Sequence, residues 1–340
     1  MSYDPAATRR IGRRDLAVSQ LGVGTAPFGS LAASDTDAAV RGAFDAVYAA
    51  GLRYLDTAPF YGLGLAEHRL GTCLRGVDRR TLVVSSKVGR LLRPLADGVA
   101  AGGSGGAYPF EVAFDYSYDG ALRSLDCTLQ RLGTNRIDIA LLHDVNRRWQ
   151  GDLVEQRYRE AMDGAYRALV ELRDAGVIKA IGVGVNDWEI LLRFAADGDF
   201  DCFMLAGRYT LLDHTALDRF IPECVRRGIS VLMAAPFNSG ILATGARPGA
   251  TFFYVEADAS IMDRTRRIEA VCARHDVDIA AAALQFPLAH PAVASVVTGM
   301  RSAAEVAQNL AHVRAPIPAD LWRELKHEGL IADAAPVRPA

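Results

Sequence analysis

The sequence predicts an α/β protein, a single-domain (β/α)8 TIM barrel with long loops on its C-terminal rim. Eight short apolar runs are rich in Val, Ile and Leu with little alternation, as expected for parallel strands buried on both faces. Helical patterns separate the runs, and several end at a glycine, which is typical of β/α units with right-handed crossovers. Eight such units in roughly 300 residues favour a closed barrel.

The eight strands are predicted from the apolar runs alone. In chain order they cover residues 21–25, 52–57, 82–88, 137–143, 178–185, 201–206, 229–235 and 293–299. The clearest helical patterns each end in a glycine and cover residues 35–51, 118–133, 166–176 and 214–228. Ser34 and Asp35 are candidate capping residues for the first of these helices.

A doubly wound sheet is the main alternative to the barrel. Such a sheet is expected to carry a glycine-rich phosphate-binding turn after its first strand. "GVGTAPFGS" (22–30) and "GVGVND" (182–187) contain glycines, but neither has the G-x-G-x-x-G spacing. No linker composition divides the chain. We therefore expect one domain over residues 1–340, with a core at about 10–313 and a C-terminal helix and tail at 314–340.

Three connections are long, and all follow predicted strands. They cover residues 89–116, 144–158 and 237–258. In a (β/α)8 barrel, loops that follow strands lie on the C-terminal rim, where active sites are built, so we expect these loops to be functional. A variable surface insertion is the alternative for residues 89–116, because this segment contains "AAGGSGGAY".

Composition excludes several classes of function. A net charge of −2 gives no reason to expect binding to nucleic acid or to an anionic membrane. No apolar run approaches the roughly 20 residues of a membrane span, and the N-terminus does not resemble a signal peptide. The arginines of the N-terminal segment are expected to be solvated. They are Arg9, Arg10, Arg13 and Arg14.

The cysteine and histidine pattern predicts a cytoplasmic protein without a metal site. The five cysteines are far apart, odd in number and form no C-x-x-C pair, which favours reduced, packed thiols. No His/Cys cluster has the spacing of zinc ligands.

Four titratable residues are predicted to meet on the C-terminal rim. Asp56, Lys87 and His143 end the second, third and fourth strands, and Tyr61 lies on the loop after the second. Each alone is compatible with a helix cap or with packing. Together, at three consecutive strand ends, they indicate a functional site.

The four side chains form a coherent acid–base group. The pKa of tyrosine is about 10, and a neighbouring ammonium such as that of Lys87 lowers it by stabilising the phenolate. Asp56 can pair with Lys87, and His143 can orient a substrate oxygen by a hydrogen bond. This arrangement suits hydride transfer at a carbonyl or carbinol carbon. The side chains cannot carry hydride, so a nicotinamide cofactor is required.

Four segments resemble the aldo-keto reductase family. They are "LRYLDTAPFYGLGLAEHRLG", "SSKVG", "SLDCTLQRLGTNRIDIALLHD" and "GVIKAIGVGVN", and the resemblance runs from about residue 10 to residue 312. It implies a (β/α)8 barrel that uses NAD or NADP without a Rossmann domain. The catalytic tetrad of the family falls on Asp56, Tyr61, Lys87 and His143.

The resemblance also implies cofactor contacts. Asn186 matches the asparagine that holds the nicotinamide carboxamide, although Val185 replaces the usual serine before it and Ala206 stands where many members have glutamine. Tyr209 matches a tyrosine that stacks on the nicotinamide. Residues 236–242 resemble the loop over the pyrophosphate, and residues 296–310 resemble the adenosine-binding end. The implied contacts are Gly24, Thr25, Asn186, Tyr209, Pro236, Asn238, Gly240, Leu242, Gly299, Arg301, Glu305 and Asn309.

Cofactor preference is predicted from Glu305. It stands where NADP users of the family often carry an arginine, so repulsion of the 2′-phosphate favours NAD. Arg301 is the counter-argument, because it is close enough in sequence to reach a phosphate.

Within the family, four segments look most like those of bacterial sugar dehydrogenases: "FDYSYDGALRSL" (114–125), "LLHD" (141–144), "AGRYTLLD" (206–213) and the segment at 284–299. The resemblance implies hydride transfer between C1 of an aldose, of the L-fucose or D-threo type, and nicotinamide, giving a lactone. Phe28 and Trp149 are the expected substrate contacts, with packing an equal alternative for Trp149. The other candidates are pyridoxal 4-dehydrogenation, general NADPH-dependent aldehyde reduction, and a non-catalytic nucleotide-binding regulatory subunit. The expected partner is a small sugar or aldehyde, and the expected state a monomer or small homo-oligomer.

Overall fold

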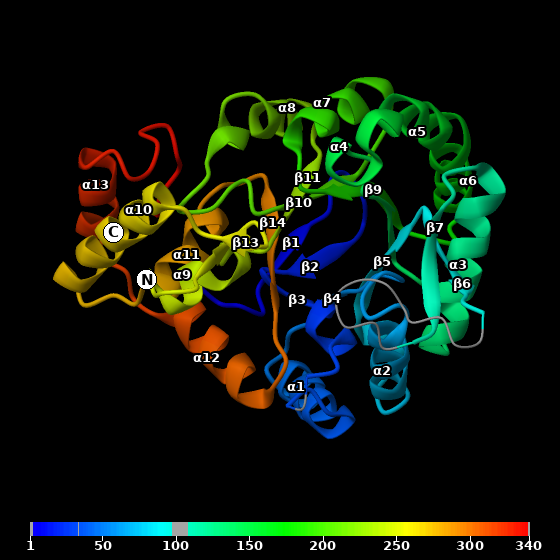
Figure 1. Ribbon diagram of the computed structural model, residues 1–340, viewed down its shortest axis with the longest axis horizontal. Coiled ribbons are helices and arrows are strands. Elements are labelled where there is room, and N and C mark those ends of the chain that lie inside the picture. Colours follow the sequence, from blue (N-terminus) through cyan, green and yellow to red (C-terminus); the bar gives the residue numbers. More distant parts are fainter. Residues whose placement is uncertain (1–2, 33, 97–107, 339–340) are drawn as a thin grey trace.

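A closed barrel of eight parallel strands forms the centre of the structure, a computed structural model that describes residues 3–32, 34–96 and 108–338 (Figure 1). In order around the barrel the strands are β3 (Leu21–Gly24), β4 (Tyr54–Asp56), β5 (Val83–Val88), β8 (Ile139–His143), β9 (Ala180–Val185), β10 (Cys202–Ala206), β11 (Ser230–Ala234) and β14 (Val293–Gly299). Strand β14 pairs with β3 and closes the ring. All eight predicted strands are confirmed, and the closed ring rules out the doubly wound sheet.

Helices surround the barrel and cover its apolar outer surface (Figure 1). The helices that connect successive strands are α1 (Asp37–Ala49), α2 (Leu65–Leu74), α3 (Tyr118–Leu132), α5 (Val154–Glu160) with α6 (Arg167–Asp174), α7 (Trp188–Asp197), α8 (Phe220–Arg227) and α11 (Ile279–Leu288). Helix α12 (Ala303–Arg314) follows the last strand, β14. A π-helical turn, Ala161–Tyr166, joins α5 to α6. Further helices are α4 (Arg147–Gln150), α9 (Ile241–Thr244), α10 (Ala259–Arg274) and α13 (Ala319–His327). In the part of the chain that the structure describes, no helix is both long and apolar enough to cross a membrane.

Two helix boundaries differ from the predicted ones. The cap of α1 is Thr36, whose Oγ1 accepts a hydrogen bond from the Ala39 amide at 3.1 Å, and not Ser34 or Asp35. The pattern at 214–228 contains a short 3-10 turn, Thr215–Leu217, before α8 begins at Phe220. The first difference arises because a helix begins at the residue whose oxygen can reach a free amide of the first turn, which here is Thr36. Among the residues that the structure describes, no side chain caps the start of α8.

The three long connections carry their own small structures. After β5, the hairpin of β6 (Arg90–Pro94) and β7 (Phe110–Phe114) rises from the barrel, and residues 97–107 lie outside the described residues. The connection after β8 contains α4, and the one after β11 contains α9 and the hairpin of β12 (Thr251–Phe252) and β13 (Val255–Glu256). These connections follow strand ends, so they lie on the predicted rim.

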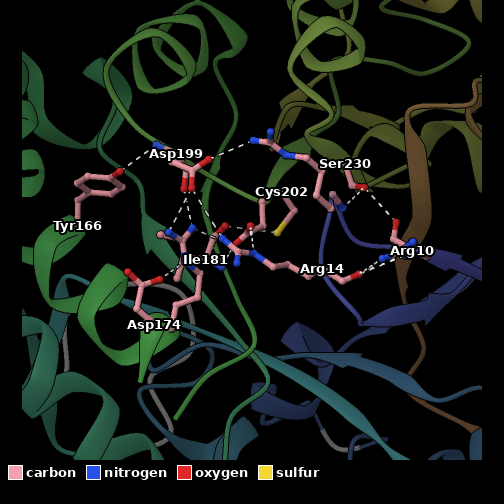
Figure 2. Close-up of polar contacts among 12 residues, drawn as sticks. Arg10, Arg14, Tyr166, Asp174, Ile181, Asp199, Cys202 and Ser230 are labelled. Atoms are coloured by element: carbon pink, nitrogen blue, oxygen red, sulfur yellow. Dashed lines mark hydrogen bonds and ion pairs between the residues drawn. The ribbon is translucent and has the colours of Figure 1, made fainter. Parts of the chain in front are cut away.

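The opposite end of the barrel is closed by the N-terminal hairpin of β1 (Thr8–Arg10) and β2 (Ala17–Ser19). Figure 2 shows the polar contacts that fasten it. Arg14 Nε lies 2.5 Å from Asp201 Oδ1, and Asp201 Oδ2 accepts a hydrogen bond from the Ile181 amide at 2.9 Å. Arg173 lies 3.3 Å from the carboxylates of both Asp199 and Asp201. This network joins the hairpin to β9 and β10.

The N-terminal arginines are therefore not uniformly solvated. Arg9 donates to the Leu288 carbonyl at 2.9 Å and to the Val293 carbonyl at 2.6 Å, and Arg14 is paired with the buried Asp201. The predicted solvated role is wrong for Arg9 and Arg14, because carbonyls and a carboxylate from distant segments lie within reach of their guanidinium groups.

A close contact between two glycines positions the loop that follows β4. A Cβ atom on Gly29 would lie 2.5 Å from the Gly62 nitrogen and from the Tyr61 carbonyl carbon, and Gly62 itself has φ +62°. The atoms that such a Cβ would meet belong to the backbone, so they cannot move aside without displacing the Tyr61 loop. The turn after β3 thus fixes where Tyr61 lies.

We expect Gly29→Ala to lower the free energy of unfolding by about 1–3 kcal/mol, the usual cost of an overpacked buried contact. The control is Gly42→Ala on α1, where a Cβ would meet no atom within 4 Å and alanine is the better helix former by about 0.5–1 kcal/mol. Urea unfolding of both variants measures the difference. Equal midpoints for Gly29→Ala and the native chain would contradict the close contact.

Candidate active site

A buried ion pair joins β4 to β5 at the C-terminal rim. Lys87 Nζ lies 2.7 Å from Asp56 Oδ2, and both side chains are almost completely buried. The ammonium also donates to the Thr57 carbonyl at 2.9 Å and to the Tyr61 hydroxyl at 3.1 Å. Ser85 Oγ donates to the second oxygen of Asp56 at 2.7 Å. Each charge is therefore paired and hydrogen-bonded, which is what makes their burial tolerable.

The protonation of Tyr61 follows from two opposing effects. Removal of its hydroxyl from water raises the pKa, Lys87 lowers it, and the balance is a pKa of about 12. Burial lowers the pKa of Lys87, but Asp56 and Tyr61 more than offset it, so the pKa of Lys87 is raised. The expected drop of the Tyr61 pKa below 10 is not found, because desolvation outweighs the ammonium. At neutral pH the protein alone holds a phenol next to an ammonium.

His143 ends β8 and completes the group of four. Its ring lies edge-on to that of Tyr61, with centroids 6.4 Å apart and an interplanar angle of 87°. Burial, with the nearby Arg90 and Lys87, holds the pKa of His143 well below its usual range, so the ring is neutral. Nδ1 is buried without a hydrogen-bond partner among the described residues. The predicted convergence of the four residues is therefore present in the structure.

Two charged residues beside His143 were missed by sequence reasoning. Arg90, on β6, is buried and pairs with Asp144, whose Oδ2 lies 3.2 Å from His143 Nε2. The guanidinium carbon of Arg90 lies 4.1 Å from the Phe60 ring centroid and 4.2 Å from that of Trp149. Their proximity in sequence to the predicted site residues could have indicated them, because Arg90 is three residues after Lys87 and Asp144 directly follows His143.

Trp149 lies at the edge of this cluster. Its side chain is 39% exposed, and its ring is edge-to-face with Phe60 at 5.4 Å. The contact with Arg90 gives Trp149 a packing role. The exposed part of the ring is compatible with the predicted substrate contact.

Several predicted cofactor residues lie on neighbouring strand ends. Gly24 on β3 pairs in register with Gly299 on β14 and with Asp56 on β4. Thr25 is buried, and its Oγ1 has no partner among the described residues. The side-chain nitrogen Nδ2 of Asn186, which follows β9, lies 3.5 Å from the Ala206 carbonyl oxygen. These groups share the rim with the tetrad.

The loop after β11 is held by its own side chains. Asn238 Nδ2 donates to the Gly207 carbonyl at 3.0 Å, and Asn238 Oδ1 accepts from Thr210 Oγ1 at 2.5 Å. Pro236 and Leu242 are buried. A Cβ on Gly240 would meet no atom within 4 Å, so this position faces open space. Asn238 thus fixes the loop, and Gly240 leaves its outer face free.

Tyr209 and Phe28 do not support the roles predicted for them. Tyr209 is 0% exposed, and its ring packs 5.1 Å from Phe286 and 5.9 Å from His290. Phe28 is also 0% exposed and belongs to the core between barrel and helices. A ring with no exposed face cannot stack on a nicotinamide or touch a substrate in this conformation. Both rings instead fill the apolar core.

Glu305 has a structural role at the start of α12. Ser302 Oγ accepts from the Glu305 amide at 3.2 Å, while Glu305 Oε2 accepts from the Arg301 amide at 2.9 Å. Arg301 Nε lies 3.3 Å from Glu305 Oε1. This reciprocal arrangement resembles a capping box, one residue displaced. Asn309, farther along α12, is buried.

The residues around the rim fit a nicotinamide dinucleotide. The first turn of α12 has amides without helical acceptors, which suit a phosphate. The unpartnered Thr25 hydroxyl and the Asn186 amide offer further hydrogen bonds. Among the described residues, no group of His, Cys, Asp and Glu is arranged to hold a metal ion.

Comparison with known proteins gives a consistent result. Residues 20–327 match the sequence model of the aldo/keto reductase family. The chain is 41% identical to pyridoxal 4-dehydrogenase of Microbacterium luteolum, over 98% of this chain and 100% of that protein. It is 38% identical to D-threo-aldose 1-dehydrogenase of a Pseudomonas species, over 97% and 98%. The holo form of an aldo-keto reductase from Bacillus halodurans superimposes with a TM-score of 0.75 at 25% identity, over 96% and 97%. The chain belongs to the aldo/keto reductase family and is an NAD(P)-dependent oxidoreductase.

Proposed function

We propose that this protein oxidises a cyclic hemiacetal to a lactone, with an aldose of the D-threo or L-fucose type as its substrate and C1 as the reacting carbon. The observation that carries the proposal is the meeting of Tyr61, Lys87 and His143 on one rim, which provides acid–base chemistry beside a substrate oxygen. The similarity to a D-threo-aldose 1-dehydrogenase supports the choice of substrate.

Pyridoxal is the second candidate, and it shares the chemistry. Its aldehyde and neighbouring hydroxymethyl group close to a cyclic hemiacetal, whose oxidation also gives a lactone. The 41% identity to a pyridoxal 4-dehydrogenase supports it, as does the aromatic pair of Phe60 and Trp149 near the tetrad. An aromatic wall suits either the apolar face of a sugar or a pyridine ring.

The roles of the protein groups follow from their charges. When bound, oxidised nicotinamide supplies the hydride acceptor and a positive charge near the reacting carbon. Tyr61, as phenolate, takes the proton of the anomeric hydroxyl, and Lys87 stabilises that phenolate. Asp56 keeps Lys87 charged. His143 is neutral, so it orients the reacting oxygen without adding a second cation to the site.

The substrate is tested by measuring NAD(P)H absorbance with a panel of aldoses, pyridoxal and simple aldehydes, each with both cofactors. We expect oxidation of D-threo aldoses, with the lactone as the product identified by mass spectrometry. Oxidation of pyridoxal alone would favour the second candidate. Activity restricted to reduction of open-chain aldehydes would contradict the hemiacetal proposal.

Tyr61→Phe is expected to fold normally and to lose turnover by roughly 10²–10⁴-fold, the usual contribution of a general acid or base. The phenol is the group that exchanges the proton, whereas the ring packing is kept. Steady-state rates with the preferred substrate measure the loss, and circular dichroism checks the fold. A rate within about threefold of the native enzyme would rule out the assignment of Tyr61.

The pH dependence of oxidation should report Tyr61. Because its pKa is raised to about 12 in the protein alone, the phenolate is scarce at neutral pH. The kcat/KM for oxidation should therefore rise with pH between about 7 and 10, while reduction, which uses the phenol, should not. A fall in the oxidation rate over this range would contradict the role of Tyr61 as base.

Lys87→Met should move this rise to higher pH, because the phenolate loses its cation. Asp56→Asn should move it less, because Asp56 acts through Lys87. Lys87→Met leaves Asp56 buried and unpaired, so the double variant Lys87→Met/Asp56→Asn controls for loss of stability. An unmoved profile in the double variant would show that Lys87 does not tune Tyr61.

For the cofactor we propose NAD in preference to NADP. The carboxylate of Glu305 stands at the start of α12 and would repel a 2′-phosphate, whereas Arg301, already paired with it, is partly neutralised. Glu305→Gln keeps an oxygen for the capping contact and removes the charge. We expect its ratio of kcat/KM for NADP over NAD to increase about tenfold, as for loss of about 1.4 kcal/mol of repulsion. An unchanged ratio would assign Glu305 to capping alone.

A further inference from the structure

We propose that the buried pair of Arg90 and Asp144 positions His143, with the Asp144 carboxylate fixing which ring nitrogen carries the proton. The inference rests on the proposed function, because it concerns the residue that orients the reacting oxygen. It adds Asp144 and Arg90 to the tetrad as positioning residues that act through His143.

The backbone around Asp144 is held so that its carboxylate stays beside His143. Asp144 has φ +55°, an uncommon conformation for a residue other than glycine. Its amide donates to the Gly184 carbonyl at 3.0 Å, and Gln150 Nε2 donates to its carbonyl at 3.0 Å. Tyr116 Oη donates to the His143 carbonyl at 2.6 Å. An uncommon backbone conformation that three hydrogen bonds hold at a strand end is typical of functional positions.

Arg90 holds the carboxylate from the other side. It is 1% exposed and pairs with Asp144 Oδ2, the same oxygen that lies 3.2 Å from His143 Nε2. The rings of Phe60, Trp149 and Phe114 lie 4.1, 4.2 and 5.1 Å from its guanidinium carbon. These rings hold the guanidinium in place. The Asp144 carboxylate that pairs with it therefore stays beside His143.

A carboxylate can only accept hydrogen bonds, whereas a neutral imidazole has one donor and one acceptor nitrogen. Asp144 beside Nε2 therefore favours the tautomer with the proton on Nε2. The opposite nitrogen, Nδ1, is buried and has no partner among the described residues that could favour the other tautomer. The tautomer decides whether the His143 nitrogen that meets the reacting oxygen is a hydrogen-bond donor or an acceptor.

Titration of Asp144 would break the arrangement. Burial raises the pKa of Asp144 to about 6, although Arg90 and Lys87 lower it, whereas the pKa of His143 lies well below its usual range. Below about pH 6 the carboxyl takes up a proton, and Arg90 loses its counter-charge. The groups that face Asp144 from neighbouring elements are Lys87, Arg90, Tyr61, Tyr116, Asp187 and Tyr254. Of these, Asp187 adds a negative charge that raises the pKa of Asp144 further.

The direct test is ¹⁵N NMR of the imidazoles in the protein without substrate or cofactor. The chain has seven histidines, and the signal of His143 is identified by its loss in His143→Gln. We expect a single Nε2–H tautomer at pH 7.5 in the native protein and a mixture in Asp144→Asn. An Nε2–H tautomer that persists unchanged in Asp144→Asn would overturn the proposal.

Kinetics provide a second readout, because the two variants should change the acid limb of the pH profile in different ways. The acid limb is measured on reduction, which uses the Tyr61 phenol and therefore stays constant with pH near neutrality. For reduction, the acid limb of kcat/KM should lie near pH 6 in the native enzyme. It should disappear in Asp144→Asn, with a loss of about tenfold at neutral pH, as for a hydrogen bond to a charged group. In Arg90→Met the limb should move to higher pH, because the cation that lowers the Asp144 pKa is gone. Arg93→Met, an exposed arginine on the same strand, is the matched control. An acid limb that stays in place in both variants would contradict the proposal.

Stability is controlled with the double variant Arg90→Met/Asp144→Asn, which leaves no buried unpaired charge. It should fold, lack the acid limb and show mixed tautomers. If the double variant keeps the native tautomer, the pair is only structural. Failure of the proposed function is distinguishable, because it would appear as absent hemiacetal oxidation in the native enzyme while the NMR result still stands.

Discussion

The ion pair between Asp56 and Lys87 is the interaction on which the rest of the site depends. A lone ammonium at this depth would lose its proton, and a lone carboxylate would gain one. Together they remain charged, and Lys87 still has donors for the Thr57 carbonyl and the Tyr61 hydroxyl. The pair exists because β4 and β5 are neighbours in the barrel, with Asp56 opposite Ser85 in register.

Charge is balanced locally throughout the rim. Lys87 faces Asp56, Arg90 faces Asp144, and His143 between them is neutral. For an ionisable group without an ion-pair partner, such as Tyr61, desolvation has the largest effect on the pKa. The pKa of Tyr61 therefore rises to about 12 despite the adjacent ammonium of Lys87. A site built this way presents little net charge to a substrate. That property suits an uncharged sugar or hemiacetal better than a phosphorylated one.

Much of the fold and the tetrad could be predicted from the sequence, and the reasons are physical. Each barrel strand is a short run of apolar residues, and a polar residue at a strand end, such as Asp56 or His143, stands out against that run. What depends on side-chain direction could not be predicted: Tyr209 and Phe28 lie in plausible loops, yet their rings turn into the core. The capping role of Glu305 and the pairing of Arg90 with Asp144, 54 residues apart, also need coordinates.

The closure of the ring has a consequence for biosynthesis. Strand β3 needs β14 as its second neighbour, and Arg9 fastens to carbonyls at Leu288 and Val293. A ribosome releases β14 after almost the whole chain, so until then β3 and β11 each present an open edge to other nascent chains. Premature termination before residue 293 would leave those edges permanently exposed. Both strand edges are thus covered only after residues 293–299 have been made.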